Sequence, residues 1–506
     1  MSVAKFFEGK NIFITGGTGF MGKILIEKLL RSCPGIGKIY VLLRSKRGRN
    51  VEERLKQLLD GEVFDKIREN NPDALDKIIG IEGNVAELNL GLSDSDRQLL
   101  VDNVNIIYHS AASVRFDDFL DESILMNIRG TREIAQLALD LKNPTILVHV
   151  STAYCNGDRY EVDEKLYPPH GDWRDAILLA ETCDKELLHI MTEKYIYPHV
   201  NTYTFAKGLG EQVVNDMCKG KIKAIITRPS IVINALDEPI AGWNDNLNGP
   251  MSLMLAAAKG LLRTSLSKLD LKLNYIPVDL VIKAIILATY DNYTESNCNE
   301  VVEVYNITQP IINLTHEPFG TLARSIVIDL PVPNVLWYPR PSLTSCYYNF
   351  YLQSIFYQML PAMFFDIVLK LMGKKTMVVK IQRKLYISTV ILMPFTMQNF
   401  TFKNDKMINI LKKLRKTNPD FDFRIKLSHE ELCKFLIDMK NGTVKYTLKE
   451  SMDPTGQTEK KHLQRLKIFD IILKIILVCL SCWLLLFKFN TIEWSQNQVY
   501  NYFQKL

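Results

Sequence analysis

A tyrosine and a lysine four residues apart, Tyr203 and Lys207, have types and spacing that suggest acid–base chemistry. Residues four apart lie on the same face of a helix, so the two side chains are neighbours if the segment is helical. The positive charge of the lysine would stabilise the phenolate and make the tyrosine a better proton donor and acceptor near neutral pH. The Y-x-x-x-K spacing is common in proteins, so the pair needs support from other residues.

Hydroxyl side chains provide that support upstream of the pair. The apolar segment Thr145–Ser151 is typical of a strand, and Thr152 follows it directly. Ligands of doubly wound α/β proteins bind at the carboxyl ends of the strands. We therefore expect Thr152 to hydrogen-bond a reacting carbonyl oxygen while Tyr203 protonates it, with Ser151 as the alternative hydroxyl.

A glycine-rich segment near the N-terminus predicts a dinucleotide site. Thr15–Lys23 reads TGGTGFMGK, follows an apolar strand and opens a helical pattern. Glycines permit a tight turn and close approach of the backbone to a pyrophosphate, and the helix N-terminus offers unpaired N–H groups. The residues expected to contact the cofactor there are Gly16, Gly17, Thr18, Gly19, Phe20 and Gly22.

Basic residues after the next strand favour NADP(H). The segment Arg44–Arg47 reads RSKR and contains no acid, whereas NAD sites usually place an Asp or Glu there for the ribose 2′-hydroxyl. Arg44 is therefore expected to bind the 2′-phosphate of NADPH. A solvated basic loop is the alternative interpretation.

The elements that must position these residues follow from an alternation of apolar strands and helices. Near-continuous apolar strands between helices predict a parallel sheet covered on both faces, and right-handed crossovers make it a doubly wound α/β fold of the extended Rossmann type. Strands are expected at Asn11–Thr15, Lys38–Arg44, Lys77–Gly83, Asn105–His109, Thr145–Ser151 and Lys223–Arg228.

Changes of pattern along the chain predict further parts after the sheet. The expected ranges are 1–235 for the NADP-binding Rossmann domain, 236–330 for a smaller substrate-side lobe, 331–346 for a proline-rich linker, 347–450 for a mostly helical C-terminal domain and 467–487 for a transmembrane or membrane-anchoring helix.

The apolar segment Lys467–Phe487 is the main candidate for a membrane helix. Its uninterrupted core begins only at Ile475 and is shorter than the roughly 20 residues that a span needs, so a helix lying in one leaflet and a buried helix stay open. Basic residues just upstream predict that the catalytic part faces the cytosol, with the endoplasmic reticulum favoured over the peroxisome. A second apolar stretch, Leu352–Met372, is expected to be a core or interfacial helix rather than a span.

The composition limits the possible partners. The net charge of +6 comes from 62 basic and 56 acidic residues, an excess too small for a dedicated nucleic-acid binder. A hydrophobic content of 47% fits contact with a lipid membrane. No cluster of His, Cys and Asp has the spacing of metal ligands, so no metal is expected.

Several motifs taken together resemble a known family. TGGTGFMGK, YTFAK and STAY are similar to the extended short-chain dehydrogenase/reductase family. VLLRSKRG, EGNVAELNLGLS, YHSAASVRFDD, TRPSIVINALDEPIAGWNDN and YIPVD resemble its fatty acyl-CoA reductase branch, and the resemblance extends to about Tyr446. Each motif is weak singly, but together they are specific.

The resemblance implies roles for particular residues. Tyr203 would be the general acid, Lys207 its partner and the ribose anchor, and Thr152 the hydroxyl that orients the carbonyl. The glycine turn would hold the cofactor phosphates, and Asn84 would touch the adenine. The candidates for substrate contact are Arg115 and Phe116, for which loop packing and a surface ion pair are the alternative.

The resemblance also implies a reaction. A long-chain fatty acyl-CoA would be reduced by NADPH to a fatty alcohol through an enzyme-held aldehyde. Two alternatives stay open: an extended short-chain dehydrogenase acting on sterols or nucleotide-sugars, and a catalytically inactive lipid-binding homologue.

Overall fold

The computed structural model describes residues 2–45, 48–294, 302–308, 312, 314–422, 424, 426–451 and 456–503. The chain divides into two compact units, each assembled from separate segments. Unit 1 consists of Met1–Asn248, Ser267–Phe319 and Val390–Lys449, and unit 2 consists of Gly249–Leu266, Gly320–Thr389 and Glu450–Leu506. The linear domain boundaries expected from the sequence stay a prediction.

Unit 1 is built around a seven-stranded parallel sheet with the order β11-β7-β5-β4-β1-β2-β3. The predicted doubly wound fold is confirmed, and all six expected strands are present with ends within one residue of their predicted positions. The strands are β1 (Ile12–Thr15), β2 (Ile39–Leu43), β3 (Ile78–Glu82), β4 (Ile106–His109), β5 (Ile146–Val150), β7 (Ala224–Pro229) and β11 (Glu303–Ile307).

The sheet extends in opposite directions from β1, with β2 and β3 on one side and β4, β5, β7 and β11 on the other. Strand β1 pairs with β2 on one side and with β4 on the other, so that Ile14 lies between Val41 and Tyr108. All residues of β1, β2 and β4 are buried, as expected of a sheet covered on both faces. Such a switch point leaves a crevice at the carboxyl ends of the two central strands, where ligands of this fold class bind.

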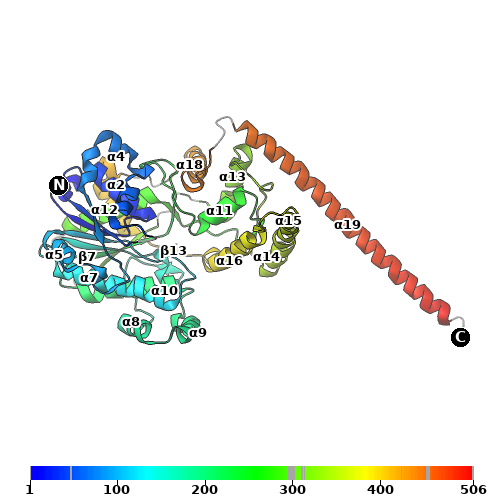
Figure 1. The fold of residues 1–506 in the computed structure, drawn as a ribbon, viewed down its shortest axis with the longest axis horizontal. Helices are drawn as coiled ribbons and strands as arrows, with labels where there is room; N and C mark the ends of the chain where they lie inside the picture. Colours follow the sequence, from blue (N-terminus) through cyan, green and yellow to red (C-terminus); the bar gives the residue numbers. More distant parts are fainter. Residues whose placement is uncertain are drawn as a thin grey trace. The chain divides into compact units, whose positions relative to one another are not determined.

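Helices cover both faces of the sheet (Figure 1). On one face α2 (Phe20–Ser32) packs against α12 (Val278–Thr294), and on the other α7 (Gly130–Asp140) packs against α10 (Thr202–Cys218). The side chain of Asn201 begins α10 by accepting a hydrogen bond from the N–H of Thr204 at 2.9 Å. This cap fixes where the first turn of α10, which carries the tyrosine, begins.

The rest of unit 1 consists of small strand pairs and C-terminal helices. The YIPVD motif contains β10 (Tyr275–Pro277), which pairs with β8 (Ile231–Ile233). Helix α18 (His429–Gly442) buries one apolar face, and Ser428 and Glu431 close its N-terminus with a capping box. The remaining elements include β6 (Glu161–Val162), β13 (Thr401–Phe402), α6 (Leu120–Ile124) and α17 (Asp405–Leu414).

Unit 2 is mostly helical. Its apolar core includes Ala256, Leu262 and Leu385. Its elements include α11 (Pro250–Ala258), β9 (Thr264–Leu266), β12 (Ser342–Thr344), α14 (Tyr347–Ser354), α15 (Leu360–Leu371), most of α16 (Val378–Thr396) and α19 (Gln457–Phe503). A π-helical turn, Ile355–Met359, joins α14 to α15, so the two form one continuous helical segment.

Among the described residues, one helical segment, Tyr347–Leu371, is long and apolar enough by length and composition to cross a membrane. The sequence places the membrane helix instead at residues 467–487, which lie within α19. The side chains of that helix beyond Trp483 lie outside the described residues. The C-terminal membrane helix therefore stays a prediction.

Candidate active site

The tyrosine–lysine pair lies on α10 beside the carboxyl end of β5. Lys207 is buried, and its ammonium group donates a hydrogen bond to the carbonyl oxygen of Val150, the last residue of β5, at 2.7 Å. One helical turn earlier, Tyr203 follows the N-terminal cap of α10. The helix face predicted from the spacing therefore points at the ligand-binding edge of the sheet.

Thr152, rather than Ser151, meets the tyrosine. The hydroxyl of Thr152 is hydrogen-bonded to that of Tyr203, and it also accepts a hydrogen bond from the N–H of Tyr154 at 3.3 Å. The hydroxyl of Ser151 is instead buried without a hydrogen-bond partner among the described residues. Of the two candidate hydroxyls, Thr152 is thus in position to share a substrate oxygen with Tyr203.

Burial controls the protonation of both members of the pair. It raises the pKa of Tyr203 above its ordinary value, an effect to which nearby Cys155 adds and which the hydrogen bond with Thr152 opposes only in part. Burial also lowers the pKa of Lys207 to about 8, although Glu211 acts in the opposite direction. The phenol pKa thus moves opposite to the direction expected from the lysine charge, so in the protein alone Tyr203 is a neutral proton donor near pH 7.

A buried ion pair continues the same helix face. Glu211 lies one turn beyond Lys207 and accepts two hydrogen bonds from the guanidinium of Arg228 in β7, at 2.7 and 2.6 Å. The thiol of Cys155 donates to the same carboxylate at 3.1 Å. Glu211 is not among the residues predicted from the sequence, although its interval from Lys207 repeats the Tyr203–Lys207 spacing and would have revealed it.

The glycine turn has the geometry that a dinucleotide phosphate requires. Gly16 has a positive φ of 78°, and a Cβ added there would lie 2.7 Å from the N atom of Ala111. A Cβ on Gly22 would lie 2.2 Å from the carbonyl oxygen of Gly16, so α2 can approach the turn only with glycine at this position. Gly19 caps α2 without a side-chain hydrogen bond, which leaves backbone N–H groups of the first turn for a phosphate.

The predicted adenosine contacts lie at the carboxyl ends of β2 and β3. Arg44 follows β2 directly and is exposed, and Asn84 lies just after β3. The Asn84 side chain donates to Glu87 at 2.9 Å, and the Ser45 hydroxyl donates to Glu82 at the end of β3. Glu82 therefore places an acid near this edge that the local sequence around Arg44 does not reveal. Lys46 and Arg47 lie outside the described residues.

The two predicted substrate residues have different surroundings. The ring of Phe116 lies 5.7 Å from the ring of Tyr203 and 5.4 Å from that of Phe395, so this residue borders the candidate active site. Arg115 is exposed and forms an ion pair with Asp117 at 3.2 Å. Within the chain, Phe116 has the position of a substrate contact and Arg115 that of a surface ion pair.

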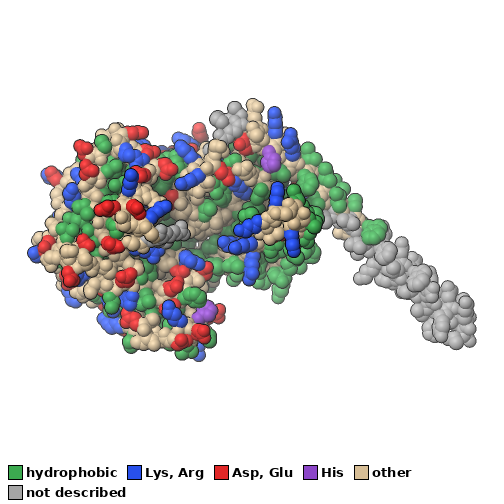
Figure 2. Space-filling view, viewed as in Figure 1, with side chains coloured by type: hydrophobic (Ala, Val, Ile, Leu, Met, Phe, Trp, Pro, Cys, Tyr) green, Lys and Arg blue, Asp and Glu red, His purple; other side chains and the backbone are tan. Residues whose placement is uncertain are grey.

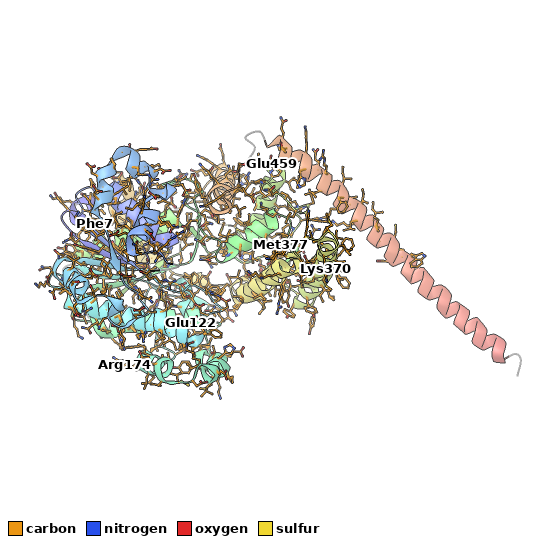
Figure 3. The ribbon with its side chains drawn as sticks, in the orientation of Figure 1. Phe7, Glu122, Arg174, Lys370, Met377 and Glu459 are labelled. Atoms are coloured by element: carbon orange, nitrogen blue, oxygen red, sulfur yellow. The ribbon has the colours of Figure 1, made fainter. Side chains whose placement is uncertain are left out.

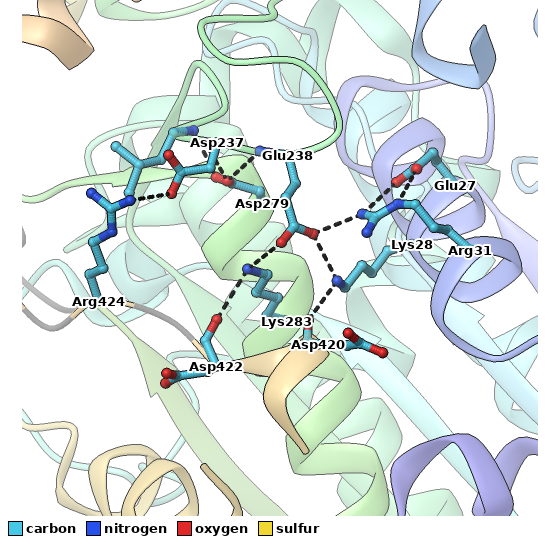
Figure 4. Close-up of polar contacts among 11 residues, drawn as sticks. Glu27, Lys28, Arg31, Asp237, Glu238, Asp279, Lys283, Asp420, Asp422 and Arg424 are labelled. Atoms are coloured by element: carbon cyan, nitrogen blue, oxygen red, sulfur yellow. Dashed lines mark hydrogen bonds and ion pairs between the residues drawn. The ribbon is translucent and has the colours of Figure 1, made fainter. Parts of the chain in front are cut away.

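A loop after β8 forms ion pairs with α2, the helix that follows the glycine turn. Residues 236–245 of this loop, which we call the strap, contain Glu238, whose carboxylate receives Lys28 and Arg31 of α2, both at 2.7 Å, and Lys283 of α12 at 2.9 Å (Figure 4). Although burial acts in the opposite direction, these cations hold the pKa of Glu238 well below its usual range. The strap therefore links α2 and α12 through ion pairs to Glu238.

Further contacts fix both ends of the strap. At one end, Asp279 of α12 accepts hydrogen bonds from the backbone N–H groups of residues 236–238 at 2.9, 2.9 and 3.1 Å. At the other end, Trp243 stacks on Phe20 with ring centroids 5.5 Å apart, and Asp245 pairs with Lys23 at 2.5 Å. The strap thus reaches the turn of α2 that would face the cofactor phosphates.

Metal ligands are not gathered anywhere in the part of the chain that the structure describes. No group of three or more His, Cys, Asp or Glu side chains there has an arrangement that could hold a metal ion. The candidate active site is instead built from hydroxyl, ammonium and backbone N–H groups.

Comparison with known proteins agrees with this geometry. Two families described as "Male sterility protein" match the chain, an NAD-binding one over residues 14–285 and a second over residues 357–450. The chain is 34% identical over 472 residues to "Fatty acyl-CoA reductase 1" of Mus musculus, covering 92% of this chain and 90% of the relative. It is 33% identical over 494 residues to "Fatty acyl-CoA reductase wat" of Drosophila melanogaster, covering 95% and 92%.

Solved structures share the fold. The terminal R domain from the myxalamid PKS-NRPS biosynthetic pathway matches with a TM-score of 0.57 at 18% identity, covering 86% of this chain and 90% of that chain. The reductase (R) domain of a nonribosomal peptide synthetase from Mycobacterium tuberculosis also has a TM-score of 0.57, at 17% identity, covering 86% and 91%. At these identities the likeness establishes the architecture alone.

The glycine turn at the switch point and the adjacent tyrosine–lysine helix define an oxidoreductase with a nicotinamide dinucleotide as cofactor. The extent of the sequence match then narrows this class. The chain belongs to the fatty acyl-CoA reductase family, as its motifs predict.

Proposed function

We propose that this protein reduces a long-chain fatty acyl-CoA to the fatty alcohol, with NADPH as the reductant. The observation that carries the proposal is the pairing of the Tyr203 and Thr152 hydroxyls at the carboxyl end of β5, with Lys207 one turn away. The reductase names of its relatives agree with this chemistry.

The residues of the chain suggest how the thioester is activated. Thr152 and Tyr203 would both hydrogen-bond the carbonyl oxygen, which fixes its position and polarises the C=O bond. The bound cofactor supplies a hydride to the carbonyl carbon. As the oxygen becomes negative, the neutral Tyr203 donates its proton, and the product is a hemithioacetal.

The same residues serve a second reduction. The hemithioacetal loses its sulfur as CoA thiol and leaves an aldehyde, which keeps its oxygen between Thr152 and Tyr203. A second molecule of NADPH would supply the second hydride, and a second proton from Tyr203 would give the alcohol. Lys207, buried beside the tyrosine, would hold the ribose and favour the transient phenolate until a proton returns from solvent.

The choice of NADPH rests on cations at the end of β2. The guanidinium of Arg54 in α3 (Val51–Leu59) donates to the carbonyl oxygen of Arg44, which places the two arginines close together. Burial lowers the pKa of Arg54, and the Arg44 charge adds to this effect. Two neighbouring cations would be relieved by a dianionic 2′-phosphate, whereas a ribose hydroxyl offers no such compensation.

The acyl part of the substrate fits the aromatic surroundings of the tyrosine. Phe116 and Tyr154 both contact Phe395, with ring centroids 5.4 and 5.0 Å apart. An apolar wall of this kind suits a hydrocarbon chain better than a nucleotide-sugar. For the localisation we keep the expectation of a C-terminal membrane helix, with the catalytic part on the cytosolic side of the endoplasmic reticulum.

The test is a product analysis with the purified full-length protein. It would be incubated with NADPH and, separately, with acyl-CoAs of several lengths, a sterol and a nucleotide-sugar, and the products would be identified by mass spectrometry. Fatty alcohol and free CoA are the expected products. Turnover of the sterol or the sugar alone, or no turnover of any substrate, would contradict the proposal.

A further inference from the structure

The helical segment from α14 to α15 in unit 2 is polar on its buried side. Phe350, Ser354, Gln358 and Ala362 recur every four residues and are all buried. The side-chain amide of Gln358 donates to the hydroxyl of Ser354 at 3.3 Å and accepts the backbone N–H of Arg263 at 3.2 Å. Two hydrogen-bonding side chains of this segment, Ser354 and Gln358, therefore point into the protein.

The opposite side of the same segment is apolar and exposed. Tyr348 is 79% exposed and Leu371 is 82% exposed. The other large apolar side chains on this surface include Tyr351, Leu352, Phe356, Tyr357, Leu360, Met363, Phe364 and Ile367. A surface helix in water has the reverse arrangement, and contiguous exposed apolar surface of this kind marks a contact site.

Residues 468–476 of α19 also bury a polar side chain and expose apolar ones. Asp470 is buried, where it accepts hydrogen bonds from the indole of Trp337 at 2.7 Å and from Arg263 at 3.0 Å. Trp337 also contacts Phe365 of α15 and Phe469 of α19, with ring centroids 6.0 and 5.4 Å apart. The exposed side chains of α19 nearby include Ile468, Ile471, Ile472, Ile475 and Ile476. Trp337 thus contacts both α15 and α19, and each of these helices exposes apolar side chains.

Basic side chains border this surface. Lys374 and Lys375 form the exposed turn after α15, and α16 continues with exposed Lys380, Arg383 and Lys384. No acidic residue occurs in the sequence between Asp366 and Asp405. Figure 2 shows hydrophobic side chains gathered over α14 and α15, with Lys and Arg side chains beside them. Apolar area next to unopposed positive charge is complementary to an anionic lipid surface.

The segment is fixed to the protein along one side, which is incompatible with a lone span. The carboxylate of Asp366 accepts hydrogen bonds from the N–H groups of residues 377–379 at 3.0, 2.9 and 3.0 Å and so ties α15 to the start of α16. Lys370 lies near the end of α15, and Met377 lies just before the start of α16 (Figure 3). Phe350 stacks on Tyr386 of α16 with ring centroids 5.6 Å apart. A helix crossing alone would expose the buried Ser354 and Gln358 groups to hydrocarbon.

We propose that α14 and α15 form a docking surface that lies in the headgroup region of an anionic phospholipid bilayer. The apolar side chains enter the outer part of one leaflet, and the basic turn and the start of α16 meet the lipid phosphates. The helix Tyr347–Leu371 therefore lies along the membrane and does not cross it. This contact is separate from any anchor that α19 provides, and it does not depend on the reaction proposed above.

A fluorescent amino acid in place of Phe364 tests this depth in the full-length protein. The protein would be reconstituted in vesicles of phosphatidylcholine and phosphatidylserine that carry spin-labelled lipids, with the same label at Leu88 as a control. Leu88 is an exposed apolar residue in unit 1, so it matches Phe364 in type but not in place. We expect a blue shift at Phe364 and stronger quenching by spin labels near the headgroup than by labels at the bilayer centre.

Three results of that experiment would overturn the proposal. Stronger quenching from the bilayer centre would mean that the segment spans. Quenching no greater than at Leu88 would mean that the surface meets water. A blue shift without lipid quenching would mean that a protein, including a second copy of this chain, covers it.

Charge reversal tests the anionic partner. Lys374→Glu with Lys375→Glu should lower the ratio of docked to undocked label by a factor on the order of tenfold or more in vesicles that contain phosphatidylserine. Lys412→Glu with Lys416→Glu, on exposed lysines of unit 1, is the matched control and should change little. Equal effects of the two pairs, or docking that is independent of phosphatidylserine, would overturn the electrostatic part of the proposal.

Discussion

The two units of this protein treat polar groups in opposite ways. In unit 1, apolar strands fill the centre, and the buried charges described above have an ionic or hydrogen-bonding partner, as Arg228 has in Glu211. In unit 2, the segment from α14 to α15 buries Ser354 and Gln358 and exposes its aromatic residues. Since the same physical preferences act in both units, the difference indicates two solvents: water around unit 1 and lipid at one face of unit 2.

The largest effect is expected from removing the acid of unit 1. Tyr203→Phe deletes the buried proton donor, so kcat for alcohol formation should fall by a factor of about 10²–10⁴. NADPH binding, measured by fluorescence titration, should remain because the glycine turn is unchanged. Lipid docking by unit 2 should also be unaffected. Alcohol formation at close to the normal rate would show that another group donates the proton.

The ion pair of Arg228 with Glu211 tests whether a buried charge in unit 1 needs its partner. Arg228→Met leaves the Glu211 carboxylate buried without its guanidinium, and this should lower the free energy of unfolding by about 3–5 kcal/mol. The double variant Arg228→Met with Glu211→Leu removes both charges and should recover much of the loss. Denaturant unfolding measures both, and a double variant no better than the single one would contradict the explanation by an unpaired charge.

Arg44 tests the electrostatics of the exposed edge of unit 1. Arg44→Asp should raise KM for NADPH by about 10–100-fold, because a charge-assisted contact is replaced by repulsion. KM for NADH should change far less. Lys66→Asp, at an exposed lysine on α4 (Asp65–Asn70), is a control for general charge effects. Equal use of both cofactors by the unaltered protein would refute the predicted preference.

Gln358 sharpens the comparison from the side of unit 2. Gln358→Leu removes the acceptor of the Arg263 N–H and should lower the free energy of unfolding by about 1–3 kcal/mol. Gln353→Leu, on the same segment but outside that contact, should cost less. The two variants are compared by thermal unfolding in detergent. If Gln358→Leu stabilised the protein, the buried hydrogen bonds of Gln358 would not contribute to the stability of unit 2.

The smallest effect concerns pH. Burial raises the pKa of Glu164 to about 7, although the N–H groups of Asn306 and Lys406 donate to its carboxylate. The folded protein then binds this proton more tightly than the unfolded chain, so stability should fall as pH rises from the unfolded pKa near 4.5 through 7. Glu164→Gln should flatten this dependence by on the order of 1 kcal/mol, whereas exposed Glu161→Gln should not. An unchanged slope in unfolding midpoints would contradict the assignment to Glu164.

The sheet was largely predictable because each central strand is a short, continuous apolar run that stays buried on both faces. Strand β11 was not predicted, since its partner β7 lies far earlier in the chain and the surrounding sequence has a loop-like pattern. The tyrosine–lysine face was predicted from its spacing together with the hydroxyl residues at the end of β5. The direction of the Tyr203 pKa was not predicted, because a local pattern contains no information about burial by distant elements.

The unit 2 helix shows a second limit of sequence patterns. Hydropathy along residues 352–372 indicates an apolar helix. Its few polar residues do not show which side of the helix faces the rest of the protein until the packing partner is known. Asp470 illustrates the same point, because it interrupts an apolar run in the sequence yet is buried against Trp337 and Arg263 in the structure. A charge within an apolar helix can therefore mark its protein-facing side.

The strap has a consequence for the order in which the protein can be made. Asn234, which lies just before the strap, donates a hydrogen bond from its side-chain amide to the hydroxyl of Thr443. Lys28 of α2 donates a hydrogen bond to the carbonyl oxygen of Asp420. Both partners leave the ribosome long after the sheet has been translated. The first 235 residues, which contain the glycine turn and α2, therefore emerge before α2 can form its hydrogen bond with Asp420. Synthesis has to pass Thr443 before that helix is fully held, so nascent chains stopped earlier should be the ones that chaperones and proteases recognise.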